Sequence, residues 1–178
     1  PAYHATMPLS TVVGGCMSSR LFQEIREKRG LVYSIYSFAL PFLDSGLFGI
    51  YAGTGEQEAA ELVPVLLDEL RRIADGISPE EIARARAQVK SSLLMSLEST
   101  GSRCEQIARQ MQLFGRIIDT SETVAKIDAV DEGAMIRAAE TLFRARPTLA
   151  TIGPVRAIPS FEAINQRLVA LSRTRSVF

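Results

Sequence analysis

The sequence has few of the residues from which metal sites and covalent frameworks are built. It contains one histidine, His4, and two cysteines, Cys16 and Cys104, which lie far apart in the chain. A zinc site with two histidine ligands therefore cannot form within one copy of the chain. Two distant cysteines provide no disulfide framework. The motifs H-E-x-x-H, H-x-x-E-H and C-x-x-C are also missing, so the sequence predicts no metal site.

An excess of charge and a long apolar run are missing too. The 20 Lys and Arg residues balance the 20 Asp and Glu residues, and the formal net charge at pH 7 is +0. A neutral chain has no long-range field that would attract nucleic acid or an anionic membrane surface. No apolar run approaches the roughly 18 residues of a transmembrane helix. We therefore expect neither nucleic acid nor a membrane as a partner.

The first residues lack an initiator methionine and the basic and apolar regions of a signal peptide. We expect the chain to be a piece of a longer polypeptide. For that reason the missing signal does not fix the compartment, which stays unknown with the cytoplasm favoured.

What is present is the composition of a globular domain. Apolar residues make up 47% of the sequence and charged residues 22%. A chain of about this size buries roughly two thirds of its unfolded surface without a metal or disulfide. The hydrophobic pattern predicts an α+β fold, with a small, mostly antiparallel sheet and helices packed on one face. The expected strands span 31–40, 47–53 and 147–152, and the expected helices span 5–13, 18–28, 56–74, 79–99, 103–114, 121–127, 132–143 and 159–171.

Two local signals refine the helix boundaries. Ser78, Pro79 and Glu81 form the pattern of a capping box with proline in the first helical position. Pro64 lies inside the apolar stripe of the helix predicted over 56–74. We expect this proline to kink the helix or to mark its true start near residue 62.

Arg26 and Tyr33 are the first candidate pair for chemistry. Arg26 lies near the end of a predicted helix, and Tyr33 lies early in the following strand, across a turn at Gly30. A guanidinium fork and a hydroxyl aimed at one point would form a clamp for a carbonyl oxygen or an oxyanion. Arginine is also favoured at helix C-termini, and tyrosine commonly packs on strands. Spacing alone leaves both interpretations open.

Two weaker candidates also come from the sequence. Gly14 and Gly15 before a helix could bind a phosphate or another small molecule, although no Lys-Ser/Thr pair follows. Cys16 and His4 could form a nucleophile–base pair, but a single cysteine is more often a small buried hydrophobic residue.

The segment over 14–33 reads GGCMSSRLFQEIREKRGLVY. It resembles the second, non-zinc half of the pitrilysin-type zinc metallopeptidases, the inverzincin family, in the branch that includes the mitochondrial processing peptidase and respiratory-chain core subunits. Three further sequence features typical of the family occur in the expected order: Gly46-Leu47-Phe48, Ser78 to Glu81, and Gly153-Pro154. The resemblance covers roughly 1–154. It implies a C-terminal-half domain over 1–154, lacking its first strand or strands, with 155–178 as the C-terminal helix and tail of that domain.

The resemblance implies a fold of two similar halves that close like a clamshell around an unfolded peptide. The first half binds zinc through H-x-x-E-H and a distant glutamate. The second half supplies an arginine and a tyrosine, which match Arg26 and Tyr33 here. We expect Ser18, Ser19 and Arg20 to bind substrate as well. The chain would then be the substrate-binding half of a zinc metalloendopeptidase, inactive alone, with zinc in its partner half. The alternative is a structural or assembly subunit of the same fold.

The sequence departs from the family pattern in two places. Cys16 occupies a position where the family often has a third glycine. Few residues precede Gly14, so we expect at least one sheet strand to be missing or to belong to another chain. A sheet edge left unpaired favours association with another copy, and we expect a homo-oligomer.

Overall fold

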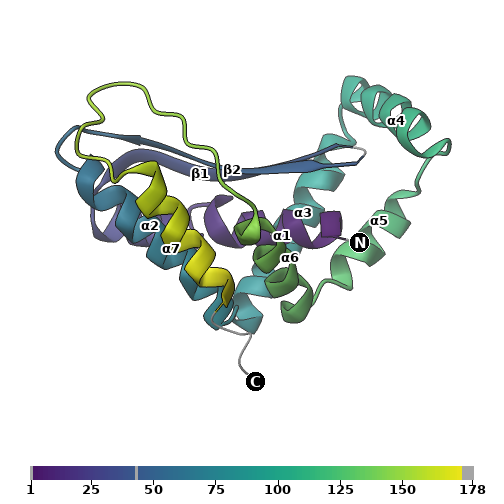
Figure 1. Ribbon diagram of the computed structural model, residues 1–178. Helices are drawn as coiled ribbons and strands as arrows, with labels where there is room; N and C mark the ends of the chain where they lie inside the picture. Colours follow the sequence, from purple (N-terminus) through teal and green to yellow (C-terminus); the bar gives the residue numbers. More distant parts are fainter. Residues whose placement is uncertain (1, 43, 174–178) are drawn as a thin grey trace.

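A computed structural model describes residues 2–42 and 44–173 (Figure 1). The described chain is mostly helical, with one two-stranded sheet. The predicted α+β class is therefore confirmed. The elements are α1 (Ala2–Gly14), the π-helix η1 (Phe22–Lys28), β1 (Val32–Pro41), β2 (Gly46–Thr54), α2 (Ala59–Asp75), α3 (Pro79–Ser96), α4 (Thr100–Phe114), α5 (Thr120–Asp128), α6 (Glu132–Arg144) and α7 (Phe161–Arg173).

The strands β1 and β2 form the predicted antiparallel hairpin, in which Tyr36 lies opposite Tyr51 and Leu40 lies opposite Leu47. Both strands are rich in β-branched and aromatic residues, which favour a half-buried sheet. The hairpin crosses the upper part of the molecule in Figure 1, and the bodies of α1, α2, α6 and α7 lie below it. One face of the sheet is therefore covered by helices. The described helices leave the opposite, open face uncovered, and residues 146–160 arch over one end of it.

The hydrophobic core lies between the hairpin and the helices, with α1 at its centre. The helix α1 contacts β1, α3 and α6. The large, fully buried side chains of the core come from several of these elements, and they include Leu9, Leu21, Ile25, Ile73 and Met135. Burial of residues of this size stabilises the fold by about 1.5 to 3 kcal/mol each.

The glycine pair that follows the first predicted helix has a packing explanation. A Cβ on Gly14 would lie 2.6 Å from the backbone nitrogen of Ser37 on β1, and a Cβ on Gly15 would lie 2.6 Å from the Cα of Thr11. The close approach of α1 to the sheet therefore requires glycine at position 14, and the close approach of the following residue to the backbone of α1 requires glycine at position 15. These contacts account for the glycines without a bound phosphate.

The capping box at the start of α3 is confirmed. The backbone N–H of Glu81 donates to Ser78 Oγ at 3.2 Å, and the backbone N–H of Ser78 donates to Glu81 Oε2 at 2.9 Å. Pro79 occupies the first turn. The two reciprocal bonds satisfy N–H groups that have no partner within the helix.

Of the two alternatives predicted at Pro64, a kink or a helix start near residue 62, the second is wrong. The helix α2 begins at Ala59 and continues through Pro64. Pro64 lies early in this helix, where its missing N–H removes one hydrogen bond. The buried residues Leu62, Val65 and Leu70 hold the same helix against the core, so packing outweighs the loss.

The strand predicted over 147–152 is wrong as well. Residues 146–160 contain no helix or strand, and this segment arches over one end of the hairpin (Figure 1). A strand requires a neighbouring edge for its hydrogen bonds. In the described part of the chain, β1 and β2 pair only with each other. Ile152 is fully exposed. The predicted division at residues 154 and 155 stays a prediction, and residues 174–178 of the predicted tail lie outside the described residues.

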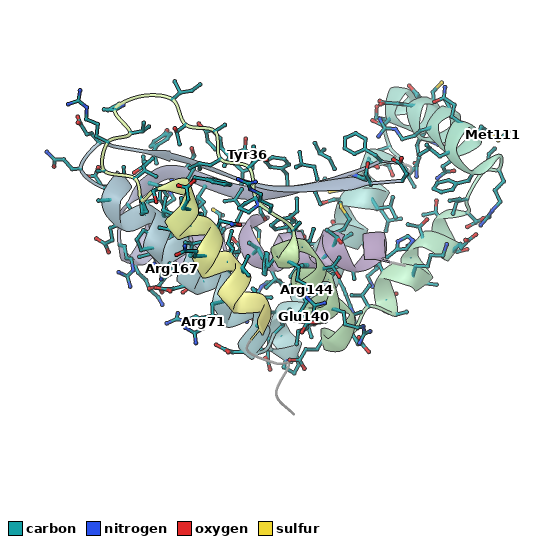
Figure 2. All side chains as sticks on the ribbon, viewed as in Figure 1. Tyr36, Arg71, Met111, Glu140, Arg144 and Arg167 are labelled. Atoms are coloured by element: carbon teal, nitrogen blue, oxygen red, sulfur yellow. The ribbon has the colours of Figure 1, made fainter. Side chains whose placement is uncertain are left out.

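The helix α4 differs from the other long helices because it stands away from the body of the molecule. It buries none of its residues. Figure 2 shows its side chains at the far end of the molecule from α7, with Met111 labelled. No helix in the described ranges is long and apolar enough to cross a membrane.

Candidate functional site

Arg26 and Tyr33 lie side by side in the structure. The Cζ atom of Arg26 is 5.9 Å from the ring centroid of Tyr33 and 4.8 Å from the ring centroid of Phe22. Gly30 lies between the two elements with φ of 66°, a left-handed conformation that glycine adopts at low cost. Ile25 is fully buried beside Arg26 and anchors the helix. The predicted proximity of Arg26 and Tyr33 therefore follows from the turn and from the packing behind it.

Each member of this pair lies on an irregular backbone segment. Arg26 belongs to a π-helix, a rare form with i→i+5 hydrogen bonds that is frequent at functional sites. Tyr33 is the extra residue of a β-bulge, because Val32 pairs with Thr54 and Ser34 pairs with Gly53.

The bulge decides where Tyr33 points. In a regular strand, Tyr33 and the buried Ile35 would share one face, because side chains alternate with a period of two. The extra residue changes this alternation, so Val32 and Ile35 are both buried while Tyr33 is 87% exposed. Its phenol group is therefore directed to solvent beside the guanidinium of Arg26.

The cations around Arg26 have carboxylate partners. Arg20 Nε lies 2.7 Å from Glu81 Oε1. Lys28 Nζ lies 2.8 Å from Glu24 Oε2. Arg29 forms ion pairs with Glu24 at 3.2 Å and with Glu61 at 2.8 Å.

Arg26 has no such partner. Within residues 2–42 and 44–173, it forms no ion pair, and its side chain contacts are the rings of Phe22 and Tyr33. A guanidinium that stacks on a ring uses its flat face and keeps its N–H groups in the plane free to donate. The structure therefore leaves Arg26 available to bind an oxygen atom.

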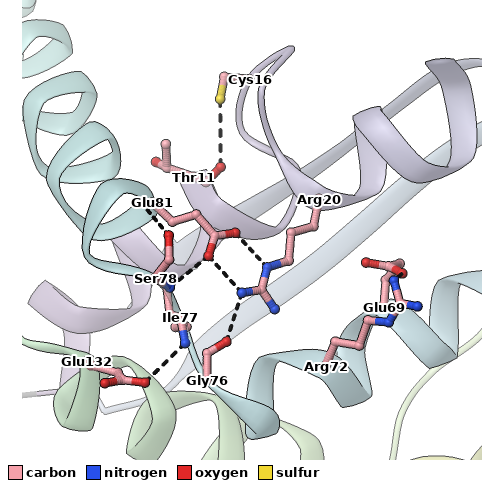
Figure 3. A network of polar contacts seen from close by, with 10 residues as sticks. All are labelled: Thr11, Cys16, Arg20, Glu69, Arg72, Gly76, Ile77, Ser78, Glu81 and Glu132. Carbon is pink, nitrogen blue, oxygen red and sulfur yellow. Dashed lines mark hydrogen bonds and ion pairs between the residues drawn. The ribbon is translucent and has the colours of Figure 1, made fainter. Parts of the chain in front are cut away.

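Arg20 and Ser19, which we predicted to bind substrate, have partners within the chain, and Figure 3 shows those of Arg20. Arg20 donates from Nε and Nη2 to the two carboxylate oxygens of Glu81, and from Nη2 to the carbonyl oxygen of Gly76 at 2.8 Å. Ser19 is buried and donates from Oγ to the carbonyl oxygen of Cys16 at 2.5 Å. The bonds of Arg20 join the start of the η1 segment to the α2–α3 turn and the start of α3, whereas the bond of Ser19 is local. Ser18 is exposed nearby. Substrate binding by the three residues stays a prediction.

We refer to Arg20, Gly76, Ser78 and Glu81 as the Arg20 network. The hydrogen bond from Arg20 holds the pKa of the Glu81 carboxyl below its usual value. An open hollow of about 750 Å³ lies against this network. Glu69 is buried beside it, with Arg72 Nη1 at 2.7 Å, and burial raises the pKa of the Glu69 carboxyl. The ionised groups here bind one another, as is typical of a structural network.

No metal site is found among the described residues. No three His, Cys, Asp or Glu side chains within residues 2–42 and 44–173 lie close enough to hold a metal ion. His4 lines a hollow between α1, α3 and α5, and burial lowers the pKa of its imidazole. Cys16 donates its thiol to the carbonyl oxygen of Thr11 at 4.0 Å and does not line that hollow. The described residues therefore do not fit a zinc ion, and their geometry does not favour a Cys16–His4 pair.

Sequence reasoning did not assign a role to Phe22, whose ring supports Arg26. The sequence does contain a signal for this contact, because Phe22 and Arg26 are four positions apart and residues at i and i+4 of a helix are neighbours. The π-helix has no comparable signal. The bulge has a weak sequence signal. The apolar residues Val32 and Ile35 are three positions apart, whereas residues on one face of a regular strand are separated by an even number of positions.

Comparison with known proteins agrees with this fold. Residues 1–89 match the sequence profile described as "Peptidase M16 inactive domain". The chain is 39% identical over 149 residues to an uncharacterized zinc protease of Streptomyces coelicolor, covering 83% of this chain and 32% of that protein. It is 39% identical over 155 residues to the uncharacterized zinc protease YmxG of Bacillus subtilis, covering 85% of this chain and 37% of YmxG. The chain thus belongs to the M16 peptidase family, as its inactive, C-terminal domain, and spans about a third of these relatives.

Solved structures share the fold. A chain of Complex III2 from Candida albicans matches with a TM-score of 0.82 and 21% identity, over 94% of this chain and 42% of that one. A conserved protein from Enterococcus faecalis matches with a TM-score of 0.69 and 24% identity, over 78% and 32%. A protease from Helicobacter pylori matches with a TM-score of 0.62 and 21% identity, over 79% and 34%. The predicted family resemblance is confirmed.

Proposed function

We propose that this chain is the substrate-binding half of a zinc metalloendopeptidase, in which Arg26 and Tyr33 hold the peptide that is hydrolysed. The single observation that carries the proposal is the state of Arg26. Its cationic neighbours Arg20, Lys28 and Arg29 are neutralised by carboxylates, while Arg26 is stacked on rings beside an exposed tyrosine. An exposed cation without an internal partner is available to a ligand.

The two side chains would bind oxygen atoms of an unfolded peptide. The guanidinium of Arg26 has donors in a fixed fork and suits a substrate carbonyl or a developing negative charge. The hydroxyl of Tyr33 supplies one further donor. Because the ring of Phe22 holds the guanidinium in place, little reorganisation is needed when negative charge develops on the substrate oxygen.

Zinc belongs to the partner in this proposal. The family's relatives are called zinc proteases, and the described residues of this chain offer no group that could hold the metal. We therefore assign zinc to a separate half of the enzyme, encoded on the same polypeptide or on another. The isolated chain should then hydrolyse no peptide. The predicted association with another copy of the chain stays a prediction.

Tyr33→Phe in the complete two-half protein tests the proposal. The variant keeps the ring beside Arg26 and removes only the hydroxyl donor. We expect kcat for a peptide substrate to fall about a hundredfold, with KM and zinc content nearly unchanged, because the donor acts mainly in the transition state.

Lys28→Ala is the control for Tyr33→Phe, because Lys28 is 68% exposed and pairs with Glu24 on the same helix. It should keep the wild-type kcat. A wild-type kcat in Tyr33→Phe would contradict the proposal and favour a structural or assembly subunit.

A further inference from the structure

The open face of the hairpin carries a row of aromatic and aliphatic side chains. The inner face of β1 includes Ile35 and Ser37, which are buried against the helices. The opposite face carries side chains that are about half exposed, among them Tyr36 at 48% and Tyr51 at 49%. We call this face the aromatic floor; it consists of Ser34, Tyr36, Phe38 and Leu40 of β1 and Leu47, Gly49, Tyr51 and Gly53 of β2.

Glycines in β2 allow the rings of the floor to lie flat. A Cβ on Gly49 would lie 2.3 Å from Phe38 Cζ, so the Phe38 ring occupies the space of the missing side chain. The rings of Tyr36 and Tyr51 stack with centroids 5.1 Å apart. The Phe38 ring centroid is 6.2 Å from that of Tyr36. The rings therefore form a low surface across both strands.

The floor carries no charge. Neither Val32–Pro41 nor Gly46–Thr54 contains a Lys, Arg, Asp or Glu residue. Contiguous exposed apolar surface marks binding sites on proteins. A carboxylate placed on such a surface would lose hydration without gaining a partner, and an ammonium group would recover only part of its lost hydration from the ring faces. The floor therefore discriminates in favour of uncharged, apolar side chains.

The floor begins next to the Arg26–Tyr33 pair. Ser34 follows Tyr33 directly, and its Oγ lies 3.1 Å from the position of a Cβ on Gly53. The hydroxyl of Tyr51 lies 3.5 Å from the same position. From Ser34 to Leu40, β1 extends for about 20 Å at roughly 3.3 Å per residue. A peptide held by Arg26 and Tyr33 could therefore continue along the floor in extended form.

We infer that the aromatic floor binds uncharged aromatic or aliphatic side chains of the peptide that Arg26 and Tyr33 hold. This inference rests on the proposed function and adds a substrate preference to it. The occupant is the unfolded peptide, because the floor is continuous with the candidate clamp and is as long as several extended residues. A second copy of the chain is the competing occupant.

The test is the binding of peptides that differ in one residue, Phe, Leu, Lys or Glu, at a position near the scissile bond. The complete two-half protein is treated with a chelator, and the dissociation constant is measured by fluorescence anisotropy without hydrolysis. We expect the Phe and Leu peptides to bind about tenfold more tightly than the Lys and Glu peptides, the effect of partly burying one apolar side chain.

Tyr51→Glu should reverse this preference. The new carboxylate should weaken binding of the Phe peptide and strengthen binding of the Lys peptide, and the ratio of the two constants should change at least tenfold. Misfolding would weaken the binding of both peptides alike and would not reverse the order of their affinities. The matched control is Met111→Glu, since Met111 is also 49% exposed and lies on α4, away from Tyr36 in Figure 2.

The inference is overturned if Tyr51→Glu leaves the ratio unchanged, or if Met111→Glu changes it equally. It is also overturned if Tyr51→Glu only dissociates an oligomer in sedimentation, because the floor would then be an interface between copies. The proposed function fails separately. Suppose that Tyr33→Phe kept the wild-type kcat while Tyr51→Glu still changed the ratio of the dissociation constants of the Phe and Lys peptides. The proposed role of Arg26 and Tyr33 would then be wrong, and binding of peptide side chains by the aromatic floor would be supported.

Discussion

Arg20 and Arg26 lie in one short helical segment, residues 20–28, and their surroundings differ. Arg20 is 18% exposed, pairs with Glu81 and also donates to a backbone carbonyl of the α2–α3 turn. Arg26 is exposed and stacks on Phe22 and Tyr33. The same guanidinium chemistry therefore joins parts of the fold at one position and stays available at the other. A shared sequence motif does not give its members a shared role.

Arg20→Ala should show the largest effect on folding. The change removes two bonds to Glu81 and one to Gly76, and it leaves the partly buried Glu81 carboxylate without its cation. We expect the free energy of unfolding to fall by about 2 to 3 kcal/mol. Urea unfolding followed by circular dichroism measures it.

Arg109→Ala serves as the comparison for Arg20→Ala. Arg109 forms an ion pair with Glu105, and the two side chains are 64% and 71% exposed. Exposed ion pairs contribute little to the free energy of unfolding. Equal losses of stability in the two variants would show that the Arg20 network is an ordinary surface contact.

Ser78→Ala should have a smaller effect on the same network. It removes the oxygen that accepts from the Glu81 backbone and leaves the bond between Arg20 and Glu81 intact. The expected loss is about 1 kcal/mol of unfolding free energy. Ser91→Ala, in the middle of α3, should be neutral or slightly stabilising, because alanine favours helices. If both variants lost the same stability, the cap would have no special role.

The pH dependence should be the smallest effect and should have opposite signs for two carboxyls. Glu81 has a pKa below its unfolded value of 4.5. Its contribution to stability is therefore present above pH 4.5 and is lost as the pH falls toward the folded pKa. Burial raises the pKa of Glu69, so its contribution is present below pH 4.5 and is lost as the pH rises through the folded pKa.

Glu81→Gln and Glu69→Gln should change the pH profile of unfolding in opposite directions. Glu81→Gln should reduce the loss of stability on acidification, and Glu69→Gln should reduce the loss on raising the pH above 4.5. Urea unfolding at a series of pH values measures both. Profiles that shift in the same direction would show that the environments of the two carboxyls are alike.

The sequence predicted those features that depend on local patterns. The hairpin, the capping box at Ser78 and the proximity of Arg26 to Tyr33 all follow from short-range spacing. The bond between Arg20 and Glu81 spans 61 residues, and no local pattern encodes it. The strand over 147–152 has an apolar pattern, but a pattern cannot supply the neighbouring edge that a strand requires. The π-helix that carries Arg26 has no counterpart in the local spacing of the sequence.

The most direct test of the contrast between the two arginines is to replace each by lysine in the complete two-half protein and to measure kcat and Tm together. Lysine keeps the charge and removes the planar fork. We expect Arg26→Lys to lower kcat at least about tenfold with Tm nearly unchanged. We expect Arg20→Lys to lower Tm by a few degrees, since 1 kcal/mol shifts Tm by about 2 to 4 °C in a domain of this size, with kcat per folded molecule retained. An Arg26→Lys variant with lowered Tm and wild-type kcat would contradict the account.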